Sequence, residues 1–291
     1  MLREAIDSVL AQTHAAFELI VIDDGSTDNT PATLAALCRE HPNLRFESTT
    51  HRGVAAARNR GVELARSPLI AFLDSDDLWH REKLARQLDV MLANPSLEIS
   101  QCQELWIRSG RRVNPGRRHA KRGGDLFIES LRTCLVSASA VMVRTGLFRA
   151  LDGFDEAMLA AEDYDLWLRI MLDQQIGLLD EYLLTRRGGR ADQLSASTPA
   201  IDRFRILALI KLLATDRLRG GRRLATADAF VEKCKIYAGG LRRRGHIDAA
   251  DWYEQSARLA SAEWRERPVP SVAVVRDEMR SRLVHRGLES Q

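Results

Sequence analysis

The stretch Leu69–Asp77, LIAFLDSDD, decides the fold of this chain. Its first five residues are apolar and follow the breaker pair Ser67-Pro68, which predicts a buried strand over 69–73. The four residues after that strand include three carboxylates: Asp74, Asp76 and Asp77. A buried strand that ends in acids is typical of a sheet whose ligands bind at the strand ends.

A second apolar run has the same design. Phe17–Ile22 (FELIVI) precedes Asp23–Ser26 (DDGS), which again predicts a strand with a polar carboxyl end. Helices are predicted over 3–13, from about 27 to 41, over 54–65 and over 81–93, with a further strand over 44–46. This alternation predicts an α/β domain with a parallel sheet covered by helices. The two acid clusters should therefore converge on one crevice.

The remainder of the chain changes character. We expect strands over 99–107 and 138–143, separated by a basic, glycine-rich loop over 108–124. From residue 201 the pattern is helical and arginine-rich to the end, broken once by a linker at Arg267–Pro270. Apolar residues at helical spacing predict that this region packs on the catalytic domain or on a partner.

The composition fits a globular protein with a sizeable core. Of 291 residues, 45 % are hydrophobic and 29 % charged, and the net charge of +3 does not point to nucleic acid. The four cysteines show no CxxC spacing, so we expect free thiols rather than zinc or disulfides. With no membrane-length apolar run and no signal peptide, we expect a cytoplasmic protein that can touch the inner face of the membrane through a basic surface.

Carboxylates at strand ends invite a divalent metal. Mg²⁺ and Mn²⁺ prefer oxygen ligands and commonly share them with substrate phosphates. By itself, however, a D-x-D pattern is equally typical of a solvated turn that binds no metal. The sequence holds no GxxxxGK[ST] and no G-x-G-x-x-G after a strand, which excludes a P-loop and a standard dinucleotide site.

Five segments in order resemble family 2 of the GT-A glycosyltransferases. This resemblance covers residues 1–195 and implies a Rossmann-like, mostly parallel sheet flanked by helices, with a helical C-terminal extension over 196–291. It also implies a nucleotide-binding half over 1–94 and an acceptor half over 95–195. The segments are Phe17–Asp28, Arg52–Gly61, Phe72–Asp77, Gly153–Glu156 and Glu162–Arg169.

The resemblance assigns donor-binding roles to the first three segments. Asp24 resembles the acid that contacts the nucleotide base, although an Asx turn opening a helix is an equal alternative. Arg58 would approach the nucleotide or be an exposed helix arginine. Asp74 would contact the ribose or donor sugar, and Asp76 would bind Mn²⁺ or Mg²⁺ with Asp77 as a neighbour.

The last segment supplies the catalytic base. Asp163 matches the residue that takes the proton from the acceptor hydroxyl, and a single displacement with such a base inverts the anomeric centre. Glu162 and Asp163 would also suit a helix N-terminus, where acids favour the macrodipole. For Trp167, packing in the core is favoured over stacking on a sugar.

Two departures from the family pattern stand out. The family opens with a β-strand that is absent here, which indicates either an upstream start or a truncated, inactive relic. In Arg186–Ser195 relatives often carry a histidine where this chain has Arg190. An arginine cannot ligate a metal but can neutralise a diphosphate, and a flexible basic loop is the alternative.

The expected function is sugar transfer from a UDP-, GDP- or dTDP-sugar to a glycan, lipid-linked or protein acceptor, as in the synthesis of cell-envelope polysaccharide. A rival is a pseudoenzyme or scaffold that keeps the fold without turnover. A nucleotidyltransferase is opposed by the pattern from Glu162 to Trp167. Nucleic-acid binding by the basic patch at 241–246 is less favoured than a solvated face or one that docks on anionic lipid.

Overall fold

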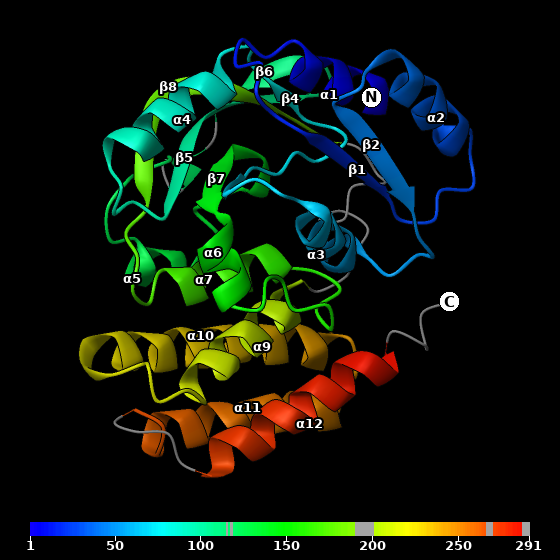
Figure 1. Ribbon diagram of the computed structural model, residues 1–291. Coiled ribbons are helices and arrows are strands. Elements are labelled where there is room, and N and C mark those ends of the chain that lie inside the picture. The colour runs from blue at the N-terminus through cyan, green and yellow to red at the C-terminus, as the bar shows by residue number, and fades with distance from the viewer. Residues whose placement is uncertain (115, 117–118, 190–200, 266–269, 287–291) are drawn as a thin grey trace.

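The computed structural model describes residues 1–291 except 115, 117–118, 190–200, 266–269 and 287–291. Its N-terminal two thirds form an α/β body, and α9 to α12 form a helical layer beneath it (Figure 1). In the described residues, no helix has the length and apolar character needed to cross a membrane. The predicted linker at 267–270 falls largely outside the described residues.

Residues 1–94 follow the predicted alternation of helices and strands closely. The amphipathic helix α1 buries Ala5, Ile6 and Val9, and Pro31 stands in the first turn of α2 where its missing N–H costs nothing. The elements are α1 (Leu2–Leu10), β1 (Leu19–Asp23), α2 (Thr30–Glu40), β2 (Leu44–Ser48), α3 (Val54–Leu64), β3 (Leu69–Ile70), β4 (Leu78–Trp79) and α4 (Lys83–Ala93).

The part of the chain from 95 to 189 contains longer strands and short helices. Strand β5 was predicted, whereas β8 was not, because charged and apolar residues are interspersed along it. The elements are β5 (Ile99–Arg108), β6 (Arg111–Val113), α5 (Phe127–Ser130), the 3₁₀ turn η2 (Ala138–Ala140), β7 (Val141–Arg144), α6 (Thr145–Ala150), α7 (Glu162–Ile170) and β8 (Gly177–Gly188).

The strands form two sheets in the described part of the chain. Strands β1 and β2 pair in parallel, and a six-stranded sheet has the order β3-β7-β5-β8-β4 with β6 beside β5. The prediction of a mostly parallel sheet is wrong for the larger sheet, where only β5 and β8 run parallel. The β5–β6 pair shows one reason: the two residues between them, Ser109 and Gly110, both have positive φ and close an antiparallel hairpin.

Two strands differ from the prediction: β1 is less buried and β3 is shorter. The apolar residues of β1 are half-buried, because among the described strands β1 pairs only with β2. Strand β3 ends at Ile70 rather than at Leu73, and the chain then leaves the sheet before the three acids, of which Asp77 is buried and the other two are half-buried. The backbone N–H of Asp74 is held there by the Ser139 hydroxyl at 3.1 Å.

The C-terminal helices pack on the body through α9, in which eight of the twelve residues are buried. Lys211 of α9 contacts Asp155 at 2.8 Å and the buried Asp165 at 2.7 Å, and Arg280 of α12 also pairs with Asp155. These ion pairs fasten the segment before α7 to the helical layer, as the predicted packing requires. The helices are α9 (Asp202–Leu213), α10 (Gly220–Arg243), α11 (Ile247–Ala262) and α12 (Pro270–Arg286).

Candidate active site

Arg58 on α3 joins the two ends of the candidate site. Its guanidinium donates to Asp74 Oδ1 at 2.7 Å and to Glu162 Oε1 at 2.6 Å, so both of its arms are engaged. The Arg58 side chain is only 13 % exposed, which excludes the exposed-helix alternative. The sequence-predicted Asp74 and Glu162, 88 residues apart in the chain, are thus brought onto one cation.

Asp24 lies at the N-terminus of α3. Its two carboxylate oxygens accept the backbone N–H groups of Arg52 and Gly53, both at 2.8 Å. Gly53 precedes the helix with φ +95°, a conformation that disfavours a side chain. The Asx turn that opens α2 is formed by Asp28, whose Oδ1 accepts the N–H of Thr30 at 2.9 Å, while Asp23 accepts the N–H of Ser26.

The acid loop after β3 is fixed by β8. Asp77 is buried and accepts the backbone N–H of Arg187 at 3.0 Å, while the Arg187 side chain donates to the backbone carbonyl of Asp76. Burial and the nearby charge of Asp74 raise the pKa of Asp77 to about 7. The pKa of Asp74 is lowered, because Arg58 and Arg186 outweigh the effect of its burial.

Helix α7 begins with the predicted acid pair. Glu162 is buried, and its burial together with the charge of Asp163 raises its pKa to about 7 despite the pairing with Arg58. Asp163 is half-buried and accepts the N–H of Tyr164 at 2.7 Å. Ala161, directly before the pair, is the N-cap residue of α7 and has a left-handed backbone (φ 57°, ψ 25°), which costs about 1 kcal/mol.

Two residues that sequence reasoning missed lie beside these acids. The Cys134 thiol is 3.8 Å from Asp163 Oδ2, and burial and the charge of Asp163 raise the pKa of Cys134. Arg186 of β8 is 3.9 Å from Glu104, and the charges of Glu104, Asp77 and Asp74 raise its pKa against the effect of burial. The only sequence signal for Arg186 was its place in the basic stretch where Arg190 was chosen.

The two remaining predicted residues have different outcomes. Trp167 is 1 % exposed and packs edge-on against Phe154, so the core role is confirmed and stacking on a sugar is excluded. Arg190 lies outside the described residues. The proposed roles of the other site residues in binding and catalysis remain predictions.

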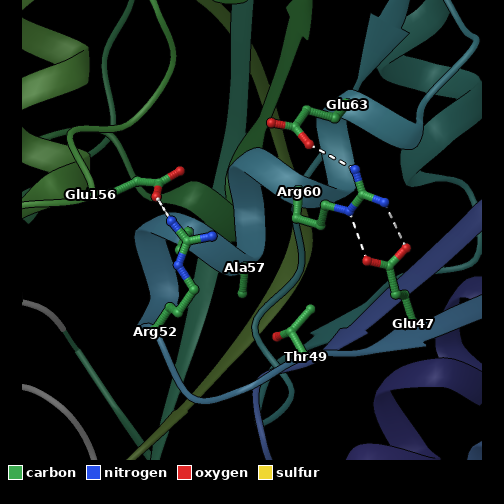
Figure 2. Close-up of a pocket in the computed structure, with 8 residues that line it drawn as sticks. Glu47, Thr49, Arg52, Ala57, Arg60, Glu63 and Glu156 are labelled. Atoms are coloured by element: carbon green, nitrogen blue, oxygen red, sulfur yellow. Dashed lines mark hydrogen bonds and ion pairs between the residues drawn. The ribbon is translucent and has the colours of Figure 1, made fainter.

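A separate polar pocket of about 300 Å³ lies on another face of α3 (Figure 2). Arg60 there binds Glu47 and Glu63, and Arg52 binds Glu156. Because Arg58 and Arg60 are about 200° apart around the helix, this pocket faces away from the Arg58 clamp. Its arginines are already paired with acids, so it is a poor candidate for a phosphate site.

The acid loop fits a hard cation only if the substrate completes the coordination. Among the described residues, no group of three or more metal-ligating side chains surrounds a common point. Asp74 is engaged by Arg58 and Asp77 by the Arg187 amide, and the role of Asp76 as a metal ligand stays a prediction. Mg²⁺ and Mn²⁺ are commonly held by one or two carboxylates together with substrate phosphates, which agrees with this arrangement.

Solved structures define the class of this fold. S. aureus TarS 1-349 in complex with UDP-GlcNAc superimposes with a TM-score of 0.67 at 18 % identity, over 89 % of this chain and 88 % of that one. The mannosyltransferase PcManGT from Pyrobaculum calidifontis, in complex with GDP-Man and Mn²⁺, gives 0.54 at 17 % identity, over 99 % and 82 % of the two chains. The fold is therefore of the GT-A type, with a helical C-terminal region.

Sequence comparisons show what the N-terminal part of the chain is similar to. The model for glycosyl transferase family 2 matches residues 1–137 of this chain. An uncharacterized glycosyltransferase of Rickettsia felis is 35 % identical over 180 residues, 62 % of this chain and 29 % of that protein. The Escherichia coli protein WfgD, a UDP-Glc:α-D-GlcNAc-diphosphoundecaprenol β-1,3-glucosyltransferase, is 32 % identical over 182 residues, 60 % of this chain and 66 % of its own length. The chain thus spans only part of these relatives.

Proposed function

We propose that this chain transfers a sugar from a nucleotide-sugar donor to an acceptor hydroxyl with inversion at the anomeric carbon. The observation that carries the proposal is the clamp of Arg58 between Asp74 and Glu162. It places the acid loop that would face the donor beside the acid pair that would face the acceptor. The match of residues 1–137 to glycosyl transferase family 2 and the similarity to nucleotide-sugar-bound GT-A structures support it.

In the proposed reaction Asp163 is the general base. Its carboxylate accepts the proton of the acceptor hydroxyl while the hydroxyl oxygen attacks the anomeric carbon. The bond from that carbon to the diphosphate oxygen breaks on the opposite side, and the electron pair leaves with the nucleoside diphosphate. Arg58 fixes Asp74 near the donor sugar, and Asp24 would contact the base. A Mg²⁺ or Mn²⁺ ion bound by Asp76 and the diphosphate would neutralise the charge of the leaving group.

For the substrates, the comparisons suggest classes. TarS and PcManGT are described with UDP-GlcNAc and GDP-Man, so a UDP-, GDP- or dTDP-sugar is proposed here as the donor. The name of the E. coli relative specifies a diphosphoundecaprenol-linked acceptor, which favours a lipid-linked acceptor over a free glycan or protein. Such an acceptor would bring this chain to the inner face of the membrane from the cytoplasm, and the exposed Arg111 and Arg112 of the β6 hairpin suit that surface.

Calorimetry tests the donor site. UDP, GDP and dTDP are titrated with and without Mn²⁺ into the protein and into Asp76→Ala. Metal-dependent binding of one nucleotide that is lost in the variant supports the proposal and identifies the base. A folded protein that binds none of the three would contradict it and leave a non-catalytic scaffold as the better description.

A further inference from the structure

We propose that a groove between α10 and α11 binds the phosphate group of a small molecule or of a lipid head group. The groove has a volume of about 420 Å³ and lies in the helical layer, which holds none of the residues of the candidate active site (Figure 1). A test of the groove is therefore independent of the proposed function. The lining residues are Lys235 and Gly239 of α10 and Glu254, Ala257, Arg258 and Ser261 of α11.

Two adjacent glycines, Gly239 and Gly240, lie within α10, where glycine is the least favourable residue after proline. The end of the helix does not need them, because Gly245, with φ +83°, supplies the left-handed residue after α10. Close packing of α11 does not need them either. A β-carbon at position 239 or 240 would lie nearest to the side chain of Arg243 or Arg244, at 3.9 and 3.4 Å, and not to α11.

The two glycines leave space for guanidinium groups and for a ligand. Without side chains at these positions, the guanidinium groups of Arg243 and Arg244 lie back along the helix, within 4 Å of the space that β-carbons would fill. Gly239 also forms part of the groove wall, so a larger side chain there would fill the groove. The chain thus gives up helix propensity at the place where two arginines meet an open groove.

The groove has an excess of positive charge. Lys235 and Arg258 line it from the two helices and are exposed, and in the part of the chain that the structure describes neither has a carboxylate within ion-pair distance. The same holds for the exposed Arg243. Glu254 is the one acid among the lining residues, and Arg242 already pairs with it at 2.9 Å. The groove therefore presents cations that an anionic ligand can neutralise.

Other arginines of the helical layer are paired with acids. Arg265 pairs with Asp228, and Arg282 pairs with Glu278 at 2.6 Å. Guanidinium and ammonium groups without such partners, gathered around one opening, suit a phosphate, which offers up to two negative charges and several acceptor oxygens. The volume of the groove is in the range typical of small-molecule sites, so it can take a phosphorylated compound as well as a head group.

An NMR titration tests the groove itself, because the amide resonances of Gly239 and Gly240 report on it and that of Gly53 reports on the proposed donor site. The probes are inorganic phosphate and glycerol 3-phosphate. Both groove resonances should shift and reach saturation. Arg258→Met and Lys235→Met should each weaken binding about tenfold, the loss expected when a charge-assisted contact is removed. Gly239→Leu should abolish binding by filling the groove.

Arg219→Met is the matched control. Arg219 is also exposed and has no acidic partner among the described residues, but it precedes α10 at the other end of the helix, about 30 Å from Gly239. This variant should bind phosphate like the unmodified protein. Equal weakening in Arg219→Met and Arg258→Met would overturn the site, and so would groove resonances that do not move in the folded, unmodified protein.

Two arms distinguish the source of the phosphate. The protein is sedimented with vesicles of phosphatidylcholine, with and without phosphatidic acid. If the ligand is a lipid head group, sedimentation requires phosphatidic acid and is lost in Arg258→Met. If the ligand is a free phosphate compound, the soluble probes bind at the groove and Arg258→Met sediments to the same extent as the unmodified protein.

Discussion

Replacing Glu162 with glutamine should make the protein more stable at pH 8 and leave it almost unchanged at pH 5. Glu162 is 4 % exposed, and its pKa is raised from 4.5 to about 7 by burial and by Asp163, with Arg58 compensating only in part. Keeping this carboxylate ionised in the folded state therefore costs about 3 kcal/mol relative to the unfolded chain. Glutamine has the shape of the protonated acid and does not have that cost.

The direction of this pH dependence follows from the number of protons that the folded and unfolded states bind. Between pH 4.5 and 7 the folded state holds a proton on Glu162 that the unfolded state has lost, so the stability of the unmodified protein falls as pH rises through this window. The penalty is complete above pH 7. The gain from Glu162→Gln should therefore be about 3 kcal/mol at pH 8 and below about 1 kcal/mol at pH 5.

Urea unfolding at the two pH values measures the difference. Glu47→Gln is the control, because Glu47 also pairs with an arginine of α3 but its pKa is lowered by Arg60. That variant should be slightly less stable at pH 8, the opposite sign. A Glu162→Gln protein that is no more stable than the original at pH 8, or equally stabilised at both pH values, would refute this reasoning.

Substitutions at three further positions separate chemistry from packing. Asp163→Asn should lower kcat about 10²- to 10⁴-fold in a nucleotide-release assay while the donor Kd measured by calorimetry stays the same, and a near-normal kcat would exclude it as the base. Trp167→Ala should lose about 3–5 kcal/mol in urea unfolding and Trp167→Phe much less, with donor binding retained in the latter. Lys211→Met should cost about 2 kcal/mol in the same assay, because the buried Asp165 keeps only Arg169 as an ionic partner. An unchanged unfolding midpoint would show that this lysine does not fasten the body to the helical layer.

The N-terminal half could be predicted from sequence because local signals agree there. The run at 17–22 and the helix at 54–64 are bounded by turn and cap residues, so periodicity alone places them within a few residues. Strand β8 was missed because it alternates between charged and apolar residues without a clear period. Its place in the sheet depends on pairing with β5, nearly 80 residues earlier, and such pairing leaves no local trace.

The sequence predicted individual residues of the candidate site but not the contacts between their side chains. Asp74, Asp163 and Arg58 were each selected from motifs, yet no motif says that Arg58 touches both Asp74 and Glu162. The roles of Arg186 and Cys134 depend on side chains that meet only after folding. The direction of the strands was mispredicted because it too depends on which strands pair after folding. The antiparallel hairpin of β5 and β6, for example, lies in a stretch whose sequence predicts an irregular loop.

The left-handed backbone of Ala161 limits how this position can vary. Its side chain is 6 % exposed, so a replacement must be small as well as tolerant of φ 57°. Glycine satisfies both conditions and asparagine the second, whereas a β-branched residue satisfies neither. A saturation library screened for folded protein should therefore retain alanine and glycine at 161 and lose valine, isoleucine and threonine. The chain would then carry, one residue before its acid pair, a position where selection acts on side-chain size and backbone geometry and not on a functional group.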